Sequence, residues 1–358
     1  MKHFKFFVGK TEIRLLHIAS GLLIVAGFGL LVWFFMQSSH QITSFSEDNN
    51  SDSEHTADSC SFHRLFDGIC VLTESEVNPK LVAIMIENHL DARPQSGLSR
   101  AAVVYEAPVE ANYSRFMALF PITEKVVKVG PVRSARPYYL DWAAEYGIPM
   151  YMHVGGSPDA LIKLKNGDYF DFNQFYRGDY FWRSTDRYAP HNVYTSTDLW
   201  TKGWDDYGKN YYSVPMDSWK FGEVAPCTTD CVTSITASFL PPVYEAEWKY
   251  SSTTQKYLRY QMGKPHVDQD GTQISAETIV VQRVQTKVLD DELRIEMNTI
   301  GTGDALVFTK GNVIKGTWKK FSKSSKTRFY DSSGQEITLT PGKIWIEVVN
   351  QVGDIDYR

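Results

Sequence analysis

The chain has 358 residues, with 37 Lys and Arg side chains against 42 Asp and Glu, a formal net charge of −5 at pH 7 and four cysteines. This length is enough for two domains of ordinary size and a short anchor. The charge is nearly balanced and no basic run occurs beyond the first residues, so the sequence lacks the basic surface that nucleic-acid-binding proteins need. We therefore expect no nucleic-acid partner.

An N-terminal membrane anchor is the first predicted element. Residues 1–14 form a basic tail with a single acid, and residues 15–36 (LLHIASGLLIVAGFGLLVWFFM) form an almost unbroken apolar run. At ~1.5 Å per residue, a helix over this run spans a ~30 Å hydrocarbon core. Because basic residues stay on the cytoplasmic side, we predict a single transmembrane helix at the cell membrane, a cytoplasmic tail and extracytoplasmic domains. A long, cleaved signal peptide is the alternative. No cysteine follows the run directly, which argues against a bacterial lipid anchor.

Residues 37–77 are interpreted as a tether that ends in a stapled loop. Residues 37–59 are mostly Ser, Asp, Glu and Asn, and such a segment cannot bury enough apolar surface to fold. The four cysteines form two close pairs in the sequence, Cys60 with Cys70 and Cys227 with Cys231. In an oxidising compartment, a disulfide within each pair is the simplest arrangement. One four-cysteine zinc site is the alternative, although these spacings fit common zinc modules poorly.

Two folded domains of an α+β protein are expected after the tether. Residues 78–226 mix strand-like apolar runs with helices, which indicates a layered sandwich of sheet and helix. Residues 227–358 contain short, often alternating runs separated by Gly-containing turns, which is typical of a mainly antiparallel β domain. In the first domain, strands are expected at residues 81–86, 101–106, 115–120, 125–129 and 150–154.

Helices of the first domain are marked by their start signals. One should begin near Pro137 and stop at Gly147, and a second should begin at Ser157, a good N-cap followed by Pro158 in the first turn. From Asp168 to Trp219 the chain is dense in aromatic residues with few clear periods. We interpret that stretch as loops packed over the site.

Several apolar runs of the first domain stop abruptly in polar clusters. Runs of this kind form buried strands or helix starts, so the polar groups at their ends should converge on one edge of the core, where α/β folds bind ligands. The clearest cases are VAIMIENHLDARPQSG, VVYEAPVEANYSRFMALF, KVGPVRSARPYYLDWA and YMHVGGSPDALIKL.

The segment GPVRSARP (130–137) is the strongest binding signal. Arg133, Ser134 and Arg136 precede a predicted helix N-terminus, where backbone N–H groups and arginine forks favour an anion such as phosphate or carboxylate. Arg93 and Arg115 are expected at the same edge. The alternative is that these arginines pair with neighbouring acids and only tie loops together.

Acids and histidines near this edge are the candidate catalytic groups. Glu87 and Glu110 each follow a strand and could act as acid, base or metal ligand, and His153 could act as a base. The loop of Gly155, Gly156 and Ser157 could cradle an oxyanion, although a tight connection between strand and helix is the simpler explanation. Loop residues that could bind the ligand are also present, namely His191 and Asn192, with His89 as a further candidate.

These segments resemble the YerB-like family of uncharacterised bacterial envelope proteins. In the first domain the resemblance lies in ARPQSGLS (92–99), VVYEAPVE (103–110), GPVRSARPYYLDWA (130–143), HVGGSP (153–158) and APHNVYTS (189–196). In the second it lies in HVDQDG (266–271), TIVVQ (278–282), GTWKK (316–320) and TRFYD (327–331). The resemblance covers residues 78–358 and implies a two-domain α+β architecture without an assigned activity.

One departure from the family concerns its glycines. Members usually carry Glu-Gly-Gly before Thr-Arg-Phe, whereas this chain has Ala111 and Asn112 between Glu110 and Tyr113-Ser114-Arg115-Phe116. The loss of glycine argues against a close approach of that backbone to a ligand.

The leading functional hypothesis is an envelope protein that binds an anionic cell-wall or lipid-linked glycan and transfers or cleaves it. The order of elements is similar, in arrangement only, to that of LytR-type phosphotransferases. In phosphoryl transfer, the four arginines would neutralise a pyrophosphate and Glu87 or Glu110 would hold Mg²⁺; no other cofactor is evident. A glycan hydrolase that uses two acids and a non-catalytic scaffold or receptor are the alternatives. The sequence leaves open whether the protein is an enzyme.

Overall fold

The computed structural model describes residues 60–211, 216–350 and 355–358, and residues 60–358 form one compact unit. The predicted tail, the transmembrane helix and residues 37–59 of the tether lie outside the described residues. None of the helices within the described ranges has the length and apolar character needed to cross a membrane.

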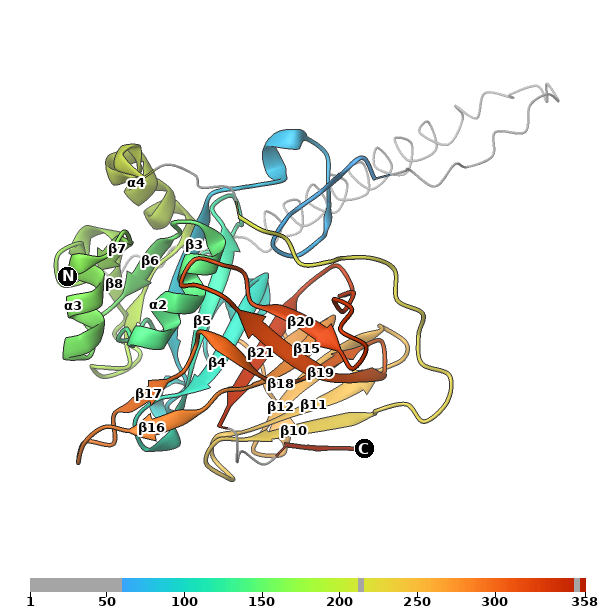
Figure 1. Ribbon diagram of the computed structural model, residues 1–358. Coiled ribbons are helices and arrows are strands. Elements are labelled where there is room, and N and C mark those ends of the chain that lie inside the picture. Colours follow the sequence, from blue (N-terminus) through green and yellow to red (C-terminus); the bar gives the residue numbers. More distant parts are fainter. Residues whose placement is uncertain (1–59, 212–215, 351–354) are drawn as a thin grey trace, which may run out of the picture. The chain divides into compact units, whose positions relative to one another are not determined.

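A ten-stranded mixed sheet is the centre of the described unit (Figure 1). Its strand order is β20-β19-β18-β15-β21-β4-β5-β3-β6-β7, so five strands come from each half of the chain. The halves meet at β4 and β21, which are parallel neighbours with Val103 opposite Ile344 and Glu106 opposite Glu347. Residues on both sides of the predicted domain boundary therefore share one sheet. Its strands are β3 (Leu81–Glu87), β4 (Val103–Pro108), β5 (Ser114–Pro121), β6 (Met150–His153), β7 (Phe170–Asn173), β15 (Thr278–Arg283), β18 (Gly301–Thr309), β19 (Asn312–Lys320), β20 (Arg328–Asp331) and β21 (Ile344–Val349).

A second, antiparallel sheet belongs to the C-terminal half. It comprises β13 (Lys264–Pro265), β12 (Lys256–Gln261), β11 (Glu245–Ser251), β10 (Ser234–Ser238) and β22 (Ile355–Tyr357), with β14 (Ser275–Ala276) paired to β12. Three two-stranded sheets are also present: β1 (Phe62–His63) with β2 (Cys70–Val71), β8 (Trp182–Arg183) with β9 (Val193–Tyr194), and β16 (Thr286–Val288) with β17 (Ile295–Met297). The prediction of a sheet-based C-terminal half in an α+β protein is confirmed.

Both predicted disulfides are present, Cys60–Cys70 and Cys227–Cys231, and no free cysteine remains. The alternative of a four-cysteine zinc site is therefore wrong.

Within the described part of the N-terminal half there are three α-helices: α2 (Pro137–Ala143), α3 (Pro158–Asn166) and α4 (Thr197–Tyr207). Two begin where the start signals predict, and Ser157 caps α3 through its side chain, which accepts from the Ala160 N–H. Short 3₁₀ helices are η1 (Glu74–Glu76), η2 (Leu90–Ala92), η3 (Leu98–Arg100), η4 (Glu110–Asn112), η5 (Ala144–Tyr146), η6 (Gly178–Tyr180) and η7 (Gly208–Asn210).

Two sequence-based predictions need correction. The strand expected at residues 125–129 does not form; this segment is irregular, and only Val129 makes a bridge, to Thr195. The stretch 168–219 is not only loops, because it contains β7, β8, β9 and α4. The buried side of α4 includes Thr197, Trp200 and Trp204, a helical spacing that the many other aromatic residues of this segment concealed.

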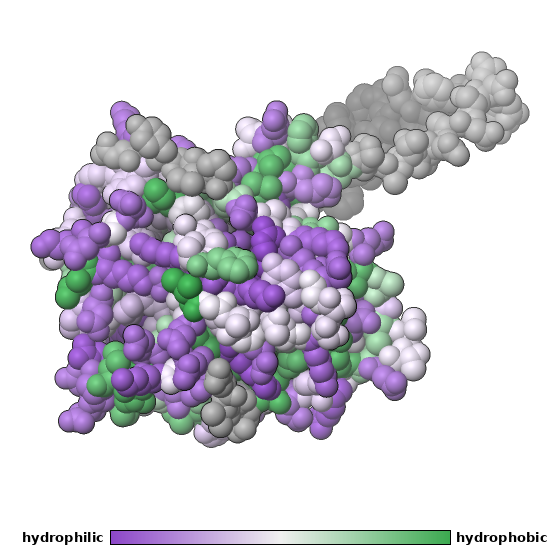
Figure 2. All heavy atoms as spheres, in the orientation of Figure 1, coloured by the Kyte–Doolittle hydropathy of each residue, from purple (hydrophilic) through white to green (hydrophobic). Residues whose placement is uncertain are grey.

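Apolar side chains of the ten-stranded sheet build a core on each of its faces. Alternate residues of β3 point to opposite sides, so Val82, Ile84 and Ile86 join one cluster and Leu81, Ala83 and Met85 the other. The first cluster also contains residues of α4 and the second sheet, and the other contains residues of α2 and α3. All of β3 is buried, which explains why it reads as a continuous apolar run. On the face in Figure 2, hydrophobic residues are scattered among hydrophilic ones.

A buried charge cluster lies where the two sheets face each other. Arg259 of β12 donates to Glu106 of β4 at 2.7 Å, and both side chains are fully buried. Glu347, beside Glu106 on the neighbouring strand, accepts from the Trp248 indole at 2.8 Å. Burial, and then the charge of Glu106, raise the pKa of Glu347 well above its usual value. Arg259 is the positive charge beside these two carboxyl groups, and the raised pKa of Glu347 favours its protonated form.

We expect Glu347→Gln to stabilise the protein more at high pH than at low pH. The folded-state pKa of Glu347 is raised, so its contribution to stability is full below the usual carboxyl pKa and is lost as pH rises through the raised value. Glutamine keeps the acceptor for Trp248 without a charge. Urea unfolding should show that the variant has a higher free energy of unfolding than the wild type, and that this difference is larger at about pH 9 than at about pH 5. The difference should grow by about 1.4 kcal/mol for each pH unit between the usual and the raised pKa of Glu347. A gain that is equal at both pH values would contradict a protonated Glu347.

Candidate functional site

A cavity of about 310 Å³ opens at the ends of β3 and β4 and the start of β5. It is lined by residues from four segments of the first half, within 87–89, 109–115, 133–136 and 190–191, and by one residue of the second half. These are Glu87, Asn88, His89, Val109, Glu110, Tyr113, Ser114, Arg115, Arg133, Arg136, Pro190, His191 and Tyr244.

Backbone pairing sets the positions of the charged groups. Glu87 is the last residue of β3 and lies opposite Arg115 of β5 in the antiparallel register. The loop before α2 continues this edge, because Glu87 N donates to Pro131 O at 2.9 Å and Arg133 N donates to Met85 O at 2.8 Å. The polar ends of separate apolar runs therefore meet, as the sequence pattern predicts.

Two of the three arginines in the cavity are paired with glutamates. Arg133 Nε donates to Glu87 Oε1 at 2.7 Å, and Arg136 Nη2 donates to Glu110 Oε2 at 2.6 Å. Burial opposes ionisation of Glu110, but the hydrogen bonds and charge of Arg136 outweigh it and lower the pKa of this carboxyl. Both glutamates are thus held by an arginine.

Arg115 is the exception in this cavity. Its residue is 7 % exposed, and its Nη1 donates to the carbonyl of Ser134 at 2.8 Å, but no carboxylate of the described residues lies within ion-pair distance. Burial, and then the charge of Arg136, lower the pKa of Arg115 to about 10, so it remains a cation at neutral pH. Three arginines against two glutamates leave one positive charge in excess, and Arg115 carries it.

Aromatic rings form the rest of the lining. Tyr113 stacks on Tyr244 with ring centroids 4.9 Å apart, and His89 stacks on His191 at 4.7 Å. Tyr244 lies in the turn between β10 and β11, so the C-terminal half completes a site built by the N-terminal half. The site therefore combines a cationic group with exposed aromatic surface.

Arg93 contributes to this junction but does not line the cavity. Its guanidinium donates to the backbone oxygens of Asn88 and Val243, each at 2.9 Å, and lies over the Tyr244 ring. It holds the turn that carries Tyr244 against the end of β3. The sequence predicted Arg93 at the same polar edge, and its position agrees with that prediction. Its contacts hold segments of the fold together.

The backbone groups of the predicted Gly-Gly loop bond to other residues of the protein. Gly155 N donates to Asn173 Oδ1 at 3.0 Å, Gly155 O accepts from Ala135 N, and Gly156 bridges to Ala135. Gly155 has a φ of +59°, which a tight turn permits glycine. This loop therefore pins the arginine loop in place, which is the alternative that the sequence left open.

Other predicted site residues also lie outside the cavity. His153 is fully buried, with its ring nitrogens 2.7 Å from Gly155 O and from Asp171 Oδ1. Ser157 caps α3, and Ser134 takes part through its carbonyl. The Asn192 amide bonds within its own loop, to Arg183, Ser184 and Arg187.

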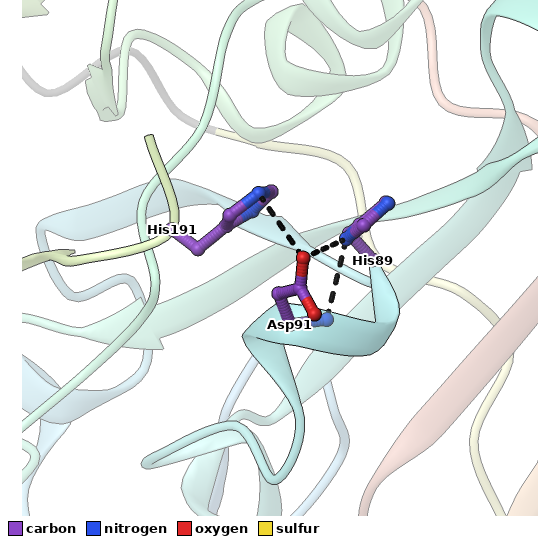
Figure 3. Close-up of side chains that lie close together, drawn as sticks. All are labelled: His89, Asp91 and His191. Carbon is purple, nitrogen blue, oxygen red and sulfur yellow. Dashed lines mark hydrogen bonds and ion pairs between the residues drawn. The ribbon is translucent and has the colours of Figure 1, made fainter. Parts of the chain in front are cut away.

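Two aromatic residues of the site and one acid at its mouth are among the residues that the sequence-based prediction missed. Tyr113 and Tyr244 reach the cavity only through tertiary packing, and no local signal marks them. Asp91 lies close to His89 and His191 at the mouth of the cavity (Figure 3). The spacing of His89 and Asp91 in the chain was the available hint. Among the described residues, these three form the group whose geometry suits a metal ion, rather than Glu87 or Glu110.

A larger cavity of about 580 Å³ is lined mainly by the stapled loop and the segment 218–223, and none of Arg115, Arg133 and Arg136 lines it. Its lining combines Leu65, Trp219 and Phe221 with the charged side chains of Arg64, Glu223 and Lys310. The smaller cavity differs in that three arginines line it together with two glutamates and two histidines.

Comparison with known proteins gives the family. Residues 68–209 match the family "Protein of unknown function (DUF3048) N-terminal domain" and residues 235–346 match its C-terminal domain. The chain is 30% identical over 285 residues to a Bacillus subtilis (strain 168) protein named "Putative lipoprotein YerB", covering 77% of this chain and 83% of that protein. The chain belongs to the YerB-like family. The crystal structure of YerB from Bacillus subtilis superposes with a TM-score of 0.72 at 28% identity, covering 82% of this chain and 99% of the other. The predicted family membership is confirmed.

The departure from the YerB-like pattern can now be placed at the cavity. Ala111 and Asn112 have φ values of 54° and 61°, the left-handed region that glycine enters without strain. The backbone thus keeps a glycine-type conformation without glycine, at a cost of order 1 kcal/mol for the alanine. Strain retained next to Glu110 is a feature of functional sites.

The two buried arginines should respond in opposite ways to replacement by methionine. Arg259→Met leaves Glu106 buried without its partner and should cost about 3–5 kcal/mol. Arg115→Met removes a buried charge that has no acid partner, so the free energy of unfolding should stay constant or rise by about 1 kcal/mol. Urea unfolding at pH 7 measures both. An equal loss in the two variants would show that Arg115 is structural.

Proposed function

We propose that this YerB-like protein is a membrane-anchored envelope protein whose cavity binds an anionic ligand. The observation that carries this proposal is Arg115, a buried cation in a cavity, with no acid partner. A buried charge normally costs several kcal/mol unless it is paired, and an incoming anion supplies the missing charge. Arg133 and Arg136 line the same cavity and add donors of suitable geometry.

The lining favours a sugar that carries a phosphate or carboxylate group. Tyr113 is exposed and supplies apolar ring surface near the cationic group, and the buried Tyr244 ring supports it by stacking. The cavity of about 310 Å³ suits a small headgroup rather than a polymer. A cell-wall or lipid-linked glycan with an anionic group has both properties. The proposal is for binding; transfer or cleavage is left out of it, because arginines hold both Glu87 and Glu110.

A non-catalytic scaffold or receptor is the second candidate. This candidate predicts that each arginine of the cavity forms an ion pair with an acid. Arg133 with Glu87 and Arg136 with Glu110 agree with that prediction. Arg115 forms no such ion pair among the described residues. The two candidates therefore differ in whether a small anion binds at Arg115.

Thermal unfolding of the full-length chain in detergent would test the anion site. The ligands are pyrophosphate, a short polyprenyl pyrophosphate and a muropeptide, with chloride added to equal ionic strength as the blank. A ligand that binds only the native state stabilises it by ~2.7 kcal/mol at 100 times its Kd, so the midpoint must rise. Arg115→Met should abolish this rise.

Arg100→Met is the matched control for the loss of one positive charge. Arg100 is paired with Glu124 on the surface, outside the cavity, so this variant should keep the full rise. The anion proposal is wrong if no ligand raises the midpoint, or if both arginine variants lose the rise equally. The scaffold would then be the better candidate.

The membrane anchor is part of the same proposal. It is supported by the apolar run at residues 15–36 and by the name of the related Bacillus subtilis protein, which calls that protein a lipoprotein. Protease added to intact spheroplasts should remove residues 60–358, and protease added to inverted vesicles should not. A chain that resists protease in spheroplasts would contradict the extracytoplasmic location.

A further inference from the structure

Three metal-binding side chains from two loops meet at the mouth of the arginine cavity. His89 precedes η2 and Asp91 lies within it, whereas His191 comes from the loop between β8 and β9. One potential ligand atom from each residue lies within 4.8 Å of the others (Figure 3). His89 and His191 also line the cavity that contains Arg115.

Distances within this cluster are close to those of a coordination shell. Asp91 Oδ2 lies 3.5 Å from His89 Nδ1 and 3.9 Å from His191 Nε2. In a tetrahedral site with metal–ligand bonds of ~2.0–2.2 Å, neighbouring ligand atoms are about 3.4 Å apart. The side chains of His89 and Asp91 are 38% and 71% exposed, so an ion can reach them and small rotations can close the remaining gap.

Glu87 orients His191 in the way that metal sites use. His191 Nδ1 lies 2.8 Å from Glu87 Oε2, and a carboxylate can only accept, so this nitrogen carries the proton. The other ring nitrogen, Nε2, lies on the side of Asp91, 3.9 Å from Asp91 Oδ2, where it can offer a lone pair to a metal ion. A carboxylate on the far nitrogen of a ligating histidine is the usual outer support of a metal ion, and here Arg133 fixes that carboxylate in turn.

The remaining contacts place acceptor atoms face to face. His89 Nδ1 accepts from the backbone N–H of Asp91 at 3.2 Å, which fixes its lone pair on that side. One ring nitrogen of His89 and one of His191 thus face the Asp91 carboxylate. A cation between them would be coordinated by all three side chains, and coordination by His89 Nδ1 would replace its contact with the Asp91 N–H.

We propose that His89, Asp91 and His191 bind one divalent transition-metal ion, of which Zn²⁺ fits best. Two imidazoles and one carboxylate suit Zn²⁺ and its neighbours, whereas Mg²⁺ and Ca²⁺ prefer oxygen ligands. Three protein ligands leave a position open, as in zinc sites that bind water or substrate rather than in closed structural sites. An anion held by Arg115 can share that position, a statement that rests on the proposed function; the metal site itself does not.

Calorimetric titration of the full-length chain with ZnCl₂ tests the site. The protein is purified through a tag without histidine and stripped with EDTA, and Co²⁺ is titrated in parallel because its visible absorption reports the ligands. We expect one Zn²⁺ per chain. His191→Gln and Asp91→Asn should each weaken binding by at least tenfold, and Glu87→Gln by about 10–100-fold through the lost support.

His63→Gln is the matched control, because His63 lies in the stapled loop and outside the cavity. It should leave Zn²⁺ affinity unchanged. The metal proposal is overturned if the wild type binds no Zn²⁺, or if His191→Gln and Asp91→Asn bind it as tightly as the wild type does. Binding of Mg²⁺ in preference to Zn²⁺ would also overturn it.

The metal and anion proposals can fail separately. Arg115→Met should keep Zn²⁺ and lose pyrophosphate, because Arg115 is not in the metal cluster. Zn²⁺ binding without any effect of pyrophosphate would refute the anion site and leave the metal site standing. A midpoint shift with pyrophosphate in a chain that binds no Zn²⁺ would do the reverse.

Discussion

The buried ion pair of Arg259 and Glu106 is the constraint on which the site depends. It joins the two sheets across the core, and removal of either partner would leave a charge in a dry interior. From it a chain of hydrogen bonds leads outward, since Arg259 donates to His266, and His266 Nε2 lies 2.8 Å from Gln95 Oε1. Gln95 in turn donates to the carbonyl of Glu87 at 3.0 Å. Burial and the charge of Arg259 keep the pKa of His266 well below its usual value, so this link is neutral. The end of β3 is thereby held by the C-terminal half.

How far the fold could be predicted depended on whether the signals were local. β3 and the start of α3 were predictable, because an unbroken apolar run and a Ser-Pro cap each lie within a few residues. The helix α4 was hidden, since its buried positions stand among many other aromatic residues. The shared sheet was beyond prediction from one sequence, because the parallel pairing of β4 with β21 joins segments from the two ends of the folded unit. The anchor predicted at residues 15–36 lies outside the described residues.

The charged residues of the site could be predicted from the sequence, but the pairing of positive with negative charges among them could not. The rule that polar residues at the ends of apolar runs converge correctly brought Glu87, Arg115 and Arg133 to one cavity. The same rule included His153, which the fold uses for its own hydrogen bonds. Which arginine lacks an acid partner depends on side-chain packing between loops, and so does the approach of Asp91 to the two histidines. A sequence pattern therefore locates the groups, and only the packing shows which of them remain available to a ligand.

The central place of β21 has a consequence for the order in which the protein is made. The ribosome synthesises β4 (Val103–Pro108) long before it synthesises the neighbouring strand β21 (Ile344–Val349). Until then β4 has an open edge, and a nascent chain with an unpaired, apolar strand is prone to associate with other chains. The ten-stranded sheet can be completed only after β21 has emerged, because β21 is the link between β15 and β4. A ribosome that stalls before residue 344 would thus release a chain without the centre of its sheet.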